Sequence, residues 1–473
     1  MSLAPPVDAS LRDAVSRPFW TDRDDAPTFD PPLEGAHEAD TVVIGGGFTG
    51  LWAAWKALER RPDSRVIVLE AERVGFGASG RNGGFVSASL THGLGHGLSM
   101  WPKEITELHQ EGQRTLAGLI DDVAAAGIDC DLHEVGKTSL AVEPWQIDGL
   151  KSSADLSLRF GEEVEFQTRD EVQADVHSPT YLAGLRQRRG NALVDPARLA
   201  WGMARTIRER GGLVHEGSYV RSLKSAGAGV RVEVGTPERE FGTVRAREVV
   251  IATAAYPSPL RRLGYYLMPL YDHVLMTEPL SDEQLASIGW SERQGLTDAG
   301  NQFHYYRLTA DNRILWGGWD AVYHRGSRVD DSLWNDSPSH ALLANHFFAT
   351  FPQLAGTRFT HKWAGPIDST TRFTAAYGTA MGGRVAYAVG HTGLGVGAAR
   401  FSAEVALDLL DGTPTERTGY GIVRRKPFPI PGEPIRDPLV QFMRRQMVAA
   451  DQNEGRRSVV LRVLDRFGIG FNS

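Results

Sequence analysis

The apolar pattern near the start of the chain predicts a βαβ unit. Thr41 to Ile44 form a short apolar run and "SRVIVLEAE" contains a second one, and both runs predict buried strands. Between them, a cluster of glycines predicts a turn, and Leu51 to Arg60 predict a helix. Two strands that are joined through one helix within about 30 residues run parallel.

Later segments alternate between helical and strand patterns. Asp195 as an N-cap and Pro196 at the first helical position predict the start of a helix. Strand-like runs follow in "YVRSLK", "VRVEV" and "EVVIATAA", and residues 266–355 contain aromatic strands such as "QFHYYRLT". A last strand and helix begin in "VAYAVGHTGLGVG" and return to the glycine-rich pattern of the start.

Composition narrows the classes of protein. The chain has 473 residues, enough for two or three domains, with 41% hydrophobic and 23% charged residues, as in ordinary globular proteins. A net charge of -7 argues against a nucleic-acid partner. One cysteine, Cys130, excludes an intrachain disulfide and fits a reducing cytoplasm. No apolar run approaches the ~18 residues of a membrane span, and the N-terminus lacks the order of a signal peptide. We therefore expect a cytoplasmic protein without a membrane partner.

The turn after the first strand reads Gly45-x-Gly47-x-x-Gly50 and predicts a dinucleotide site. The first glycine permits the tight turn, the second admits a pyrophosphate, and the third lets helix and strand pack closely. Glu70 follows Gly50 by 20 residues, at the end of the second strand, where its carboxylate can accept hydrogen bonds from ribose hydroxyls. A second fingerprint for NADPH does not appear, which argues against a flavin reductase or an NADPH-fed monooxygenase.

A second glycine-rich segment, "GASGRNGGF" (Gly77 to Phe85), follows so soon that it suggests a cofactor longer than NAD. With this segment and "GHTGLGVG" (Gly390 to Gly397), the chain resembles the FAD-dependent amine and amino-acid oxidases, which include glycine oxidase, sarcosine oxidase and D-amino acid oxidase. It is most similar to their gamma-glutamylputrescine oxidase-like branch, in which "ASGRNGG" recurs. The similarity runs from about residue 35 to 415.

The resemblance implies FAD that is bound non-covalently by three glycine-rich segments. The segment around Gly83 would wrap the pyrophosphate, ribitol and flavin ring, and the backbone of Val220 would contact adenine. The N–H groups after Gly390 would stabilise negative charge at the N1–C2=O edge of the reduced ring. The expected cofactor-binding residues are Gly45, Gly47, Phe48, Thr49, Gly50, Glu70, Ala71, Ser79, Arg81, Asn82, Gly83, Gly84, Val220, Ala252, Thr253, Gly390, Gly393, Leu394 and Gly395.

The same resemblance implies an α/β fold in which a Rossmann-like FAD-binding domain is interleaved with a substrate domain on a mostly antiparallel β-sheet. We assign residues 39–105, 190–265 and 356–415 to the FAD-binding domain. Residues 106–189 and 266–355 form the substrate domain. An extended arm (1–38) precedes them, and a C-terminal tail rich in Pro and Arg that ends in a helix (416–473) follows and is expected to pack on its own domain.

The implied activity is oxidation of an amine C–N bond. Hydride passes to flavin N5, the imine hydrolyses, and hydrogen peroxide forms if O2 is the electron acceptor. The partners would be a small-molecule amine and O2 or another acceptor, and the protein would be a monomer or homodimer. An amino-acid or N-methyl amino-acid oxidase or dehydrogenase remains an alternative, and so does a non-catalytic flavin-binding protein that acts in assembly or partner binding.

The candidate catalytic residues are Tyr305, on the aromatic hairpin, and Asp368 and His391, near the last glycine segment. Asp368 suits a cationic amine. The resemblance also shows where an α-carboxylate clamp is missing, because Ile367 and Gly393 stand where glycine oxidase has arginines. Arg372 is the remaining candidate for such a clamp.

Two further features of the sequence bear on cofactor chemistry. Cys130 is far in sequence from the segment in which sarcosine oxidase bonds covalently to its flavin, and Leu315 falls near the position of a lysine that activates O2 there. The glycines between His92 and His96 disfavour a helix, so we expect no metal site at this pair.

Overall fold

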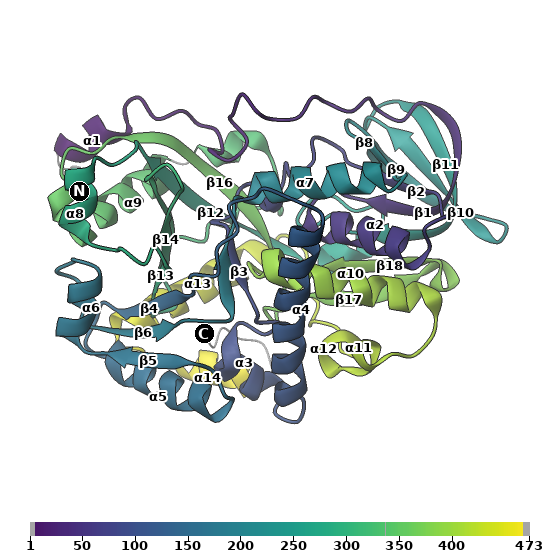
Figure 1. Cartoon of the computed structure of the whole chain (residues 1–473). Coiled ribbons are helices and arrows are strands. Elements are labelled where there is room, and N and C mark those ends of the chain that lie inside the picture. Colours follow the sequence, from purple (N-terminus) through teal and green to yellow (C-terminus); the bar gives the residue numbers. More distant parts are fainter. Residues whose placement is uncertain (1–4, 336, 467–473) are drawn as a thin grey trace.

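Two eight-stranded sheets organise the chain in a computed structural model that describes residues 5–335 and 337–466 (Figure 1). In the first sheet, β1 (Gly35–Ile44) lies between the parallel strands β11 (Glu240–Ile251) and β2 (Val66–Leu69). The remaining strands of this sheet are β8 (Leu213–His215), β9 (Tyr219–Ala226), β10 (Gly229–Gly235), β17 (Ala376–Ala380) and β18 (Val385–Val389).

Helices from distant parts of the sequence pack together against this sheet. α2 (Phe48–Arg60), which follows β1, lies between α7 (Pro196–Glu209) and α10 (Gly395–Asp411), and α4 (Ile105–Ala125) packs against α10. The apolar side chains of these helices form one buried cluster with strands β1 and β2. This packing places the N-termini of α2 and α10 near each other, although the helices are more than 300 residues apart in sequence.

The second sheet is antiparallel except for the parallel pair β13–β4, as the sequence predicts for the substrate domain. Helix α9 (Ser337–Thr350) covers one of its faces next to β12 and β15. In spatial order its strands are β16 (Phe359–Ser369), β12 (Met268–Thr277), β15 (Ile314–Gly318), β14 (His304–Leu308), β13 (Gly295–Asp298), β4 (Lys137–Ala141), β6 (Ala183–Gln187) and β5 (Val164–Gln167).

The remaining elements connect and border the two sheets. A two-stranded sheet, β3 (Phe85–Ser87) with β7 (Asn191–Leu193), lies between them (Figure 1). The other helices are α1 (Pro5–Leu11), α3 (Gly93–Met100), α5 (Gln146–Arg159), α6 (Arg169–Asp175), α8 (Asp282–Ile288), α11 (Glu416–Gly419), α12 (Gly421–Arg424), α13 (Arg436–Gln452) and α14 (Val459–Arg466).

Several local features match the sequence and others differ. The side chain of Asp195 accepts a hydrogen bond from the Arg198 N–H at 3.0 Å and caps α7, as predicted. The prediction against a helix at His92 and His96 was wrong, because α3 begins directly after His92. Strand β16 pairs with β12 in the second sheet, whereas its residues lie within the 356–415 segment that we assigned to the FAD-binding domain.

The arm and the tail that we assigned from the sequence extend beyond the described residues, because positions 1–4 and 467–473 lie outside them. Within the part that is described, none of the helices combines the length and apolar character that are needed to traverse a bilayer. In the same residues, no three His, Cys, Asp or Glu side chains converge as metal ligands.

Candidate cofactor and substrate site

The turn between β1 and α2 is built on glycine because neighbouring backbone leaves no room for a side chain. Gly45 has a φ of 111°, and a Cβ there would lie 2.5 Å from the carbonyl oxygen of Ala252. A Cβ on Gly50 would lie 1.9 Å from the carbonyl oxygen of Gly45. These contacts fix the start of α2 against the ends of β1 and β11, where its free N–H groups can bind a phosphate.

Glu70 closes the same turn from the end of β2. Its Oε2 accepts a hydrogen bond from the Gly46 N–H at 2.6 Å, and its Oε1 accepts one from the Glu72 N–H at 2.8 Å. The Ser218 N–H donates to the Glu70 carbonyl at 2.7 Å, which brings the start of β9, and hence Val220, beside this acid. Burial raises the pKa of Glu70 to about 7, so this carboxylate is poorly solvated before any ribose binds.

The second glycine segment lies across the N-terminus of α2 and is held by its own side chains. Ser79 Oγ accepts a hydrogen bond from the Phe48 N–H at 2.9 Å. Asn82 Nδ2 donates to the carbonyls of Ala78 and Ser79, and its Oδ1 accepts from the Gly84 N–H at 2.8 Å. These bonds hold the loop in one conformation beside the neighbouring cavity, which Ser79, Asn82 and Gly83 line.

Arg81 has a structural task within this loop. Its guanidinium donates to the carbonyls of Phe76 at 2.7 Å and Ala364 at 3.3 Å. It also stacks on Trp334, with 3.4 Å between the guanidinium carbon and the ring centroid. The side chain is only 3% exposed, so its charge joins the loop to β16 rather than extending into open space.

One cavity of about 1330 Å³ lies between the glycine segments and the second sheet. The predicted site residues that line this cavity are Gly47, Phe48, Thr49, Ser79, Arg81, Asn82, Gly83, Ala252, Tyr305, Asp368, His391, Gly393, Leu394 and Gly395. The other predicted residues are not part of its lining, and they are Gly45, Gly50, Glu70, Ala71, Gly84, Val220, Thr253 and Gly390. Three glycine segments with little side-chain volume thus meet at one large cavity, an arrangement that fits a long dinucleotide such as FAD.

Tyr305 packs against two glycines, Gly83 of the second glycine segment and Gly317 of β15. A Cβ on Gly83 would be 2.7 Å from its ring, and a Cβ on Gly317 would be 2.6 Å from it. Its hydroxyl donates a hydrogen bond to Asp272 on β12, a partly buried carboxylate that also lines the cavity. Burial raises the pKa of Asp272 to about 6, and burial together with this carboxylate holds the pKa of Tyr305 well above its ordinary value.

Asp272 is a site residue that the sequence analysis did not identify. It is the only charged residue in the apolar strand "MPLYDHVLM", and an isolated acid in a buried strand is the signal that could have identified it. Only the pairing of β12 with β15 and of β15 with β14 brings it to Tyr305.

Asp368 and His391 hold the third glycine segment in place. Asp368 Oδ2 accepts a hydrogen bond from the Gly390 N–H at 2.5 Å. His391 Nε2 lies 3.0 Å from Ser402 Oγ on α10 and 3.4 Å from Thr49 Oγ1 on α2. Both side chains are less than 10% exposed. Their contacts join the first and third glycine segments, so we treat them as positioning residues.

Ile367 and Gly393, which stand where the resemblance places two arginines of glycine oxidase, both line the cavity. The hypothesis that Arg372 replaces this clamp is wrong. Its guanidinium donates to the carbonyls of Ala375 at 2.9 Å, Ile422 at 3.2 Å and Arg425, and Arg372 does not line the cavity.

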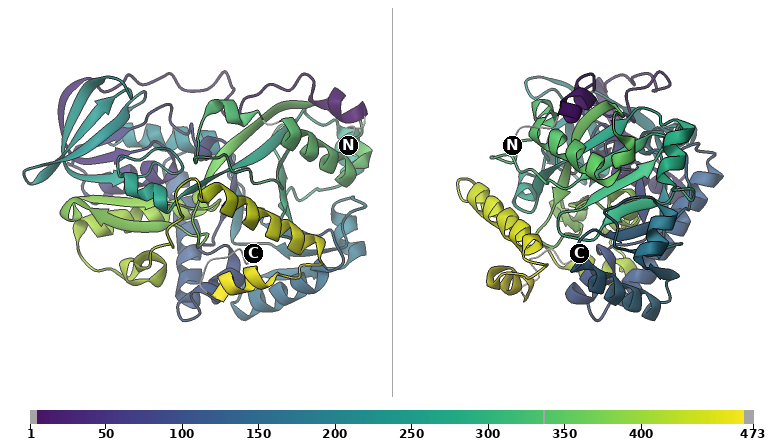
Figure 2. Two further views of the ribbon diagram at one scale, coloured as in Figure 1. Left: turned by 180° about the vertical axis from the view of Figure 1, so that it is seen from behind. Right: turned by 90° about the vertical axis from the view of Figure 1, so that its left-hand side faces the viewer.

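The C-terminal tail supplies the outer wall of the cavity. Asp451 at the end of α13 accepts hydrogen bonds from Asn301 Nδ2 at 2.6 Å and the Gln302 N–H at 2.8 Å, and Arg444 pairs with Asp320 at 2.5 Å. Figure 2 shows α13 and α14 on the face seen from behind. The tail packs on its own chain, as expected, and its cavity-lining side chains include Val440, Met443, Met447, Leu461 and Leu464.

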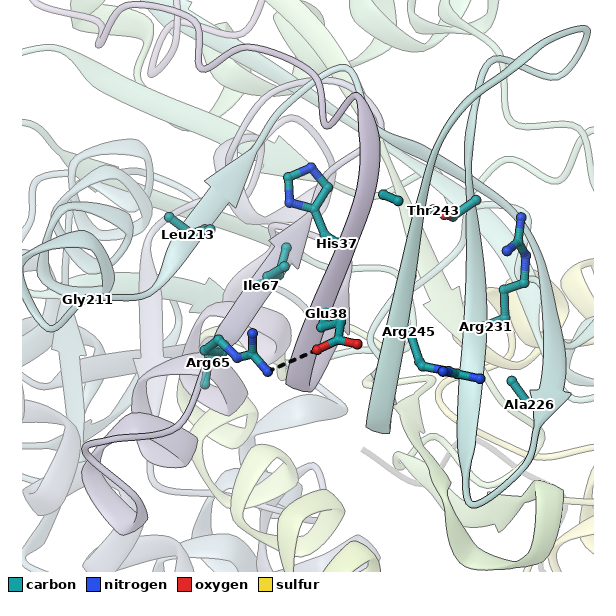
Figure 3. A pocket seen from close by; sticks show the side chains of 12 residues that line it. His37, Glu38, Arg65, Ile67, Gly211, Leu213, Ala226, Arg231, Thr243 and Arg245 are labelled. Atoms are coloured by element: carbon teal, nitrogen blue, oxygen red, sulfur yellow. Dashed lines mark ion pairs between the residues drawn. The ribbon is translucent and has the colours of Figure 1, made fainter.

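A second hollow of about 890 Å³ lies at the opposite end of the first sheet (Figure 3). His37, Arg65 and Arg245 are among its lining residues, and Arg65 pairs with Glu38 at 3.5 Å. His37 lies near the amino end of β1, and Arg65 comes directly before the first residue of β2. Ligands of open α/β sheets bind at the carboxyl ends, so this hollow is not the cofactor site.

Comparison with known proteins agrees with this geometry. Residues 40–409 match the family model described as FAD dependent oxidoreductase (DAO). Gamma-glutamylputrescine oxidoreductase of Escherichia coli K12 is 30% identical over 398 residues, which cover 82% of this chain and 88% of the relative. Glycine oxidase of Bacillus licheniformis is 24% identical over 385 residues, which cover 80% of this chain and 94% of the relative. The solved glycine oxidase of Geobacillus kaustophilus has a TM-score of 0.64 at 21% identity and shares the fold over 80% of this chain and 96% of its own.

The buried acid at the nucleotide turn predicts a pH-dependent affinity for FAD. Ribose hydroxyls donate to the ionised form of Glu70, so FAD binding to apoprotein should weaken by up to about tenfold per pH unit as the pH falls below 7. Glu70→Gln should bind FAD more weakly at pH 8 and lose this dependence. Fluorescence titration of apoprotein measures both, with exposed Glu59→Gln as the control. The same slope in Glu70→Gln would contradict the assignment.

Proposed function

Because the chain belongs to the FAD-dependent oxidoreductase (DAO) family, we propose that it oxidises a C–N bond of an amine whose reacting carbon bears no carboxylate. The substrate class is that of gamma-glutamylputrescine, a long amine, rather than an α-amino acid. The observation that carries this proposal is the cavity wall at Ile367 and Gly393, the two positions at which the resemblance to glycine oxidase places carboxylate-binding arginines. An unpaired carboxylate in such a cavity costs several kcal/mol, by the general cost of a buried charge.

Bound FAD supplies the chemistry by accepting hydride from the carbon next to the amine nitrogen. The protein must present that nitrogen without its extra proton, because a protonated amine has no lone pair to assist hydride loss. Asp272 is suited to bind the ammonium form and to accept its proton, since the pKa of this carboxyl is about 6 and it is ionised at neutral pH. Tyr305 orients Asp272 through their hydrogen bond.

The cofactor is proposed to be bound without a covalent link. Cys130 is 1% exposed and packs in the core formed by the helices around α2 and α7. It does not line the cavity. Precipitation of the holoprotein with trichloroacetic acid should therefore release the flavin into the supernatant, and flavin absorbance that stays with the pellet would contradict the proposal.

We place the enzyme in the cytoplasm, as a monomer or homodimer that transfers electrons to O2 or to another acceptor. The buried free thiol of Cys130 supports a reducing compartment. Light scattering and the ratio of peroxide formed to dye reduced would determine the oligomeric state and the acceptor.

Reduction of the flavin under argon is the direct test of the proposed function. Gamma-glutamylputrescine, added to the holoprotein, should bleach the flavin absorbance bands, whereas glycine and D-alanine at the same concentration should not. Bleaching by an α-amino acid alone would instead indicate an amino-acid oxidase. A protein that binds FAD but is reduced by none of these compounds, with dithionite reduction as the control, would support a non-catalytic flavoprotein.

The Asp272–Tyr305 pair predicts the acid limb of the pH profile. Protonation of Asp272 removes the acceptor, so kcat/KM should fall about tenfold per pH unit below about 6. Asp272→Asn should lower kcat by ~10²- to 10⁴-fold and abolish that limb. Tyr305→Phe removes a hydrogen bond that lowers the pKa of Asp272, so the limb should move to higher pH. Asp311→Asn, which changes an acid in a surface turn, is the matched control. An unchanged limb in Asp272→Asn would exclude this role.

A further inference from the structure

Lys137 is a cavity-facing cation that the proposed chemistry does not use. It is the first residue of β4, where it pairs with Gly295 of β13 and Gln187 of β6. Alternation along β4 directs Lys137 and Ser139 toward the cavity, which both residues line, and directs Thr138 and Leu140 into the interior. The ammonium group thus lies on the same face of the sheet as Tyr305.

No side chain in the described part of the chain neutralises this ammonium group by a hydrogen bond or an ion pair. Glu162 acts on it only through longer-range charge. Its Oε2 accepts a hydrogen bond from Gln187 Nε2 at 3.0 Å, and no hydrogen bond from a described residue reaches its Oε1. Lys137 is partly buried, and this burial lowers the pKa of its ammonium group. A desolvated charge of this kind is stabilised when a ligand of opposite charge binds beside it.

His92 lies near Lys137 at the same end of the cavity. It lines the cavity with a left-handed backbone (φ 55°), and its buried Nε2 has no hydrogen-bond partner among the described residues. Burial first, and then the charges of His96 and Lys137, lower the pKa of His92 to about 4, so this imidazole is neutral. A strained residue with an unsatisfied buried nitrogen is a recurring feature of ligand-binding positions.

The position of Lys137 in the sheet sets the length of the ligand. Gly317 lies beneath the hydroxyl of Tyr305, and three strand spacings along the row β15–β14–β13–β4 lead to Lys137. At ~4.8 Å per strand and two residues of offset, the two Cα atoms are about 16 Å apart. The five bonds of the lysine side chain span at most ~6 Å, so even a side chain that leaned fully toward Gly317 would leave a gap of about 10 Å. An α-amino acid is far too short to bridge this gap.

We propose that Lys137 is the anion subsite of this enzyme and binds a carboxylate at the end of the substrate remote from the oxidised C–N bond. The ligand class is a long amine with a distal carboxylate, such as a γ-glutamyl amide of a diamine. His92 and Glu162 border the same subsite and offer acceptors for an ammonium group next to that carboxylate. The inference rests on the proposed function for the position of the reacting amine.

The first test compares two amines that differ at the remote end. Gamma-glutamylputrescine carries the carboxylate, whereas N-acetylputrescine keeps the reacting amine and the amide but lacks it. Lys137→Met should raise KM for the first compound about 100-fold with little change in kcat, and should leave N-acetylputrescine unaffected. Lys137→Arg should restore part of the loss. Lys151→Met, which removes an exposed lysine of α5, is the control and should change neither.

Binding without turnover separates this inference from the proposed function. L-Glutamic acid γ-butylamide has the glutamyl end but no oxidisable amine, and calorimetry with the holoprotein should show that Lys137→Met weakens its binding about 100-fold. That result would support the subsite even if no amine reduced the flavin. Equal losses for both putrescine derivatives, or unchanged binding of the butylamide in Lys137→Met, would overturn the assignment of Lys137.

Discussion

The close approach of backbone at the β1–α2 turn is the constraint on which the rest of the site depends. The Cα of Gly50 contacts the carbonyl of Gly45, and Gly45 in turn lies against Ala252. Any side chain at these positions would separate α2 from the ends of β1 and β11. The loop from Gly77 to Phe85 contacts this helix end through the bond from the Phe48 N–H to Ser79, and the third glycine segment contacts it through Thr49 and His391. The helix terminus is therefore where the three distant segments meet, and β16 holds two of them from the other side through Ala364 and Asp368.

Partly buried charges without full compensation mark the nucleotide turn and the proposed substrate positions of the cavity. Arg81 and Arg372 are more deeply buried, but backbone carbonyls accept most of their hydrogen bonds. Glu70, Asp272 and Lys137 each have a pKa displaced toward the neutral form by burial. A protein retains such groups at a cost in stability, and ligands that donate to the acids or neutralise the cation recover that cost.

The sequence predicted the features that depend on local spacing. The β1–α2–β2 unit, the acid at the end of β2 and the N-cap of α7 all follow from short motifs, and the resemblance predicted two interleaved domains with a mostly antiparallel second sheet. It did not predict features that require strand order. Asp272 reaches Tyr305 across two strand pairings, and β16 joins the second sheet although its sequence neighbours join the first. Arg372 was misassigned because only the fold shows which carbonyls surround its guanidinium.

The wall formed by α13 and α14 has a consequence for biosynthesis. Both sheets and all three glycine segments precede α13 and α14 in the sequence, and the family match also ends before them, at residue 409. The ribosome therefore completes the sheets and the glycine segments before it makes the helices of the outer wall. Domains fold as they emerge, N-terminal parts first. The last helices then dock on strands made much earlier, through Asp451 and Arg444. The outer wall of the cavity is thus the last part of the site that the ribosome supplies.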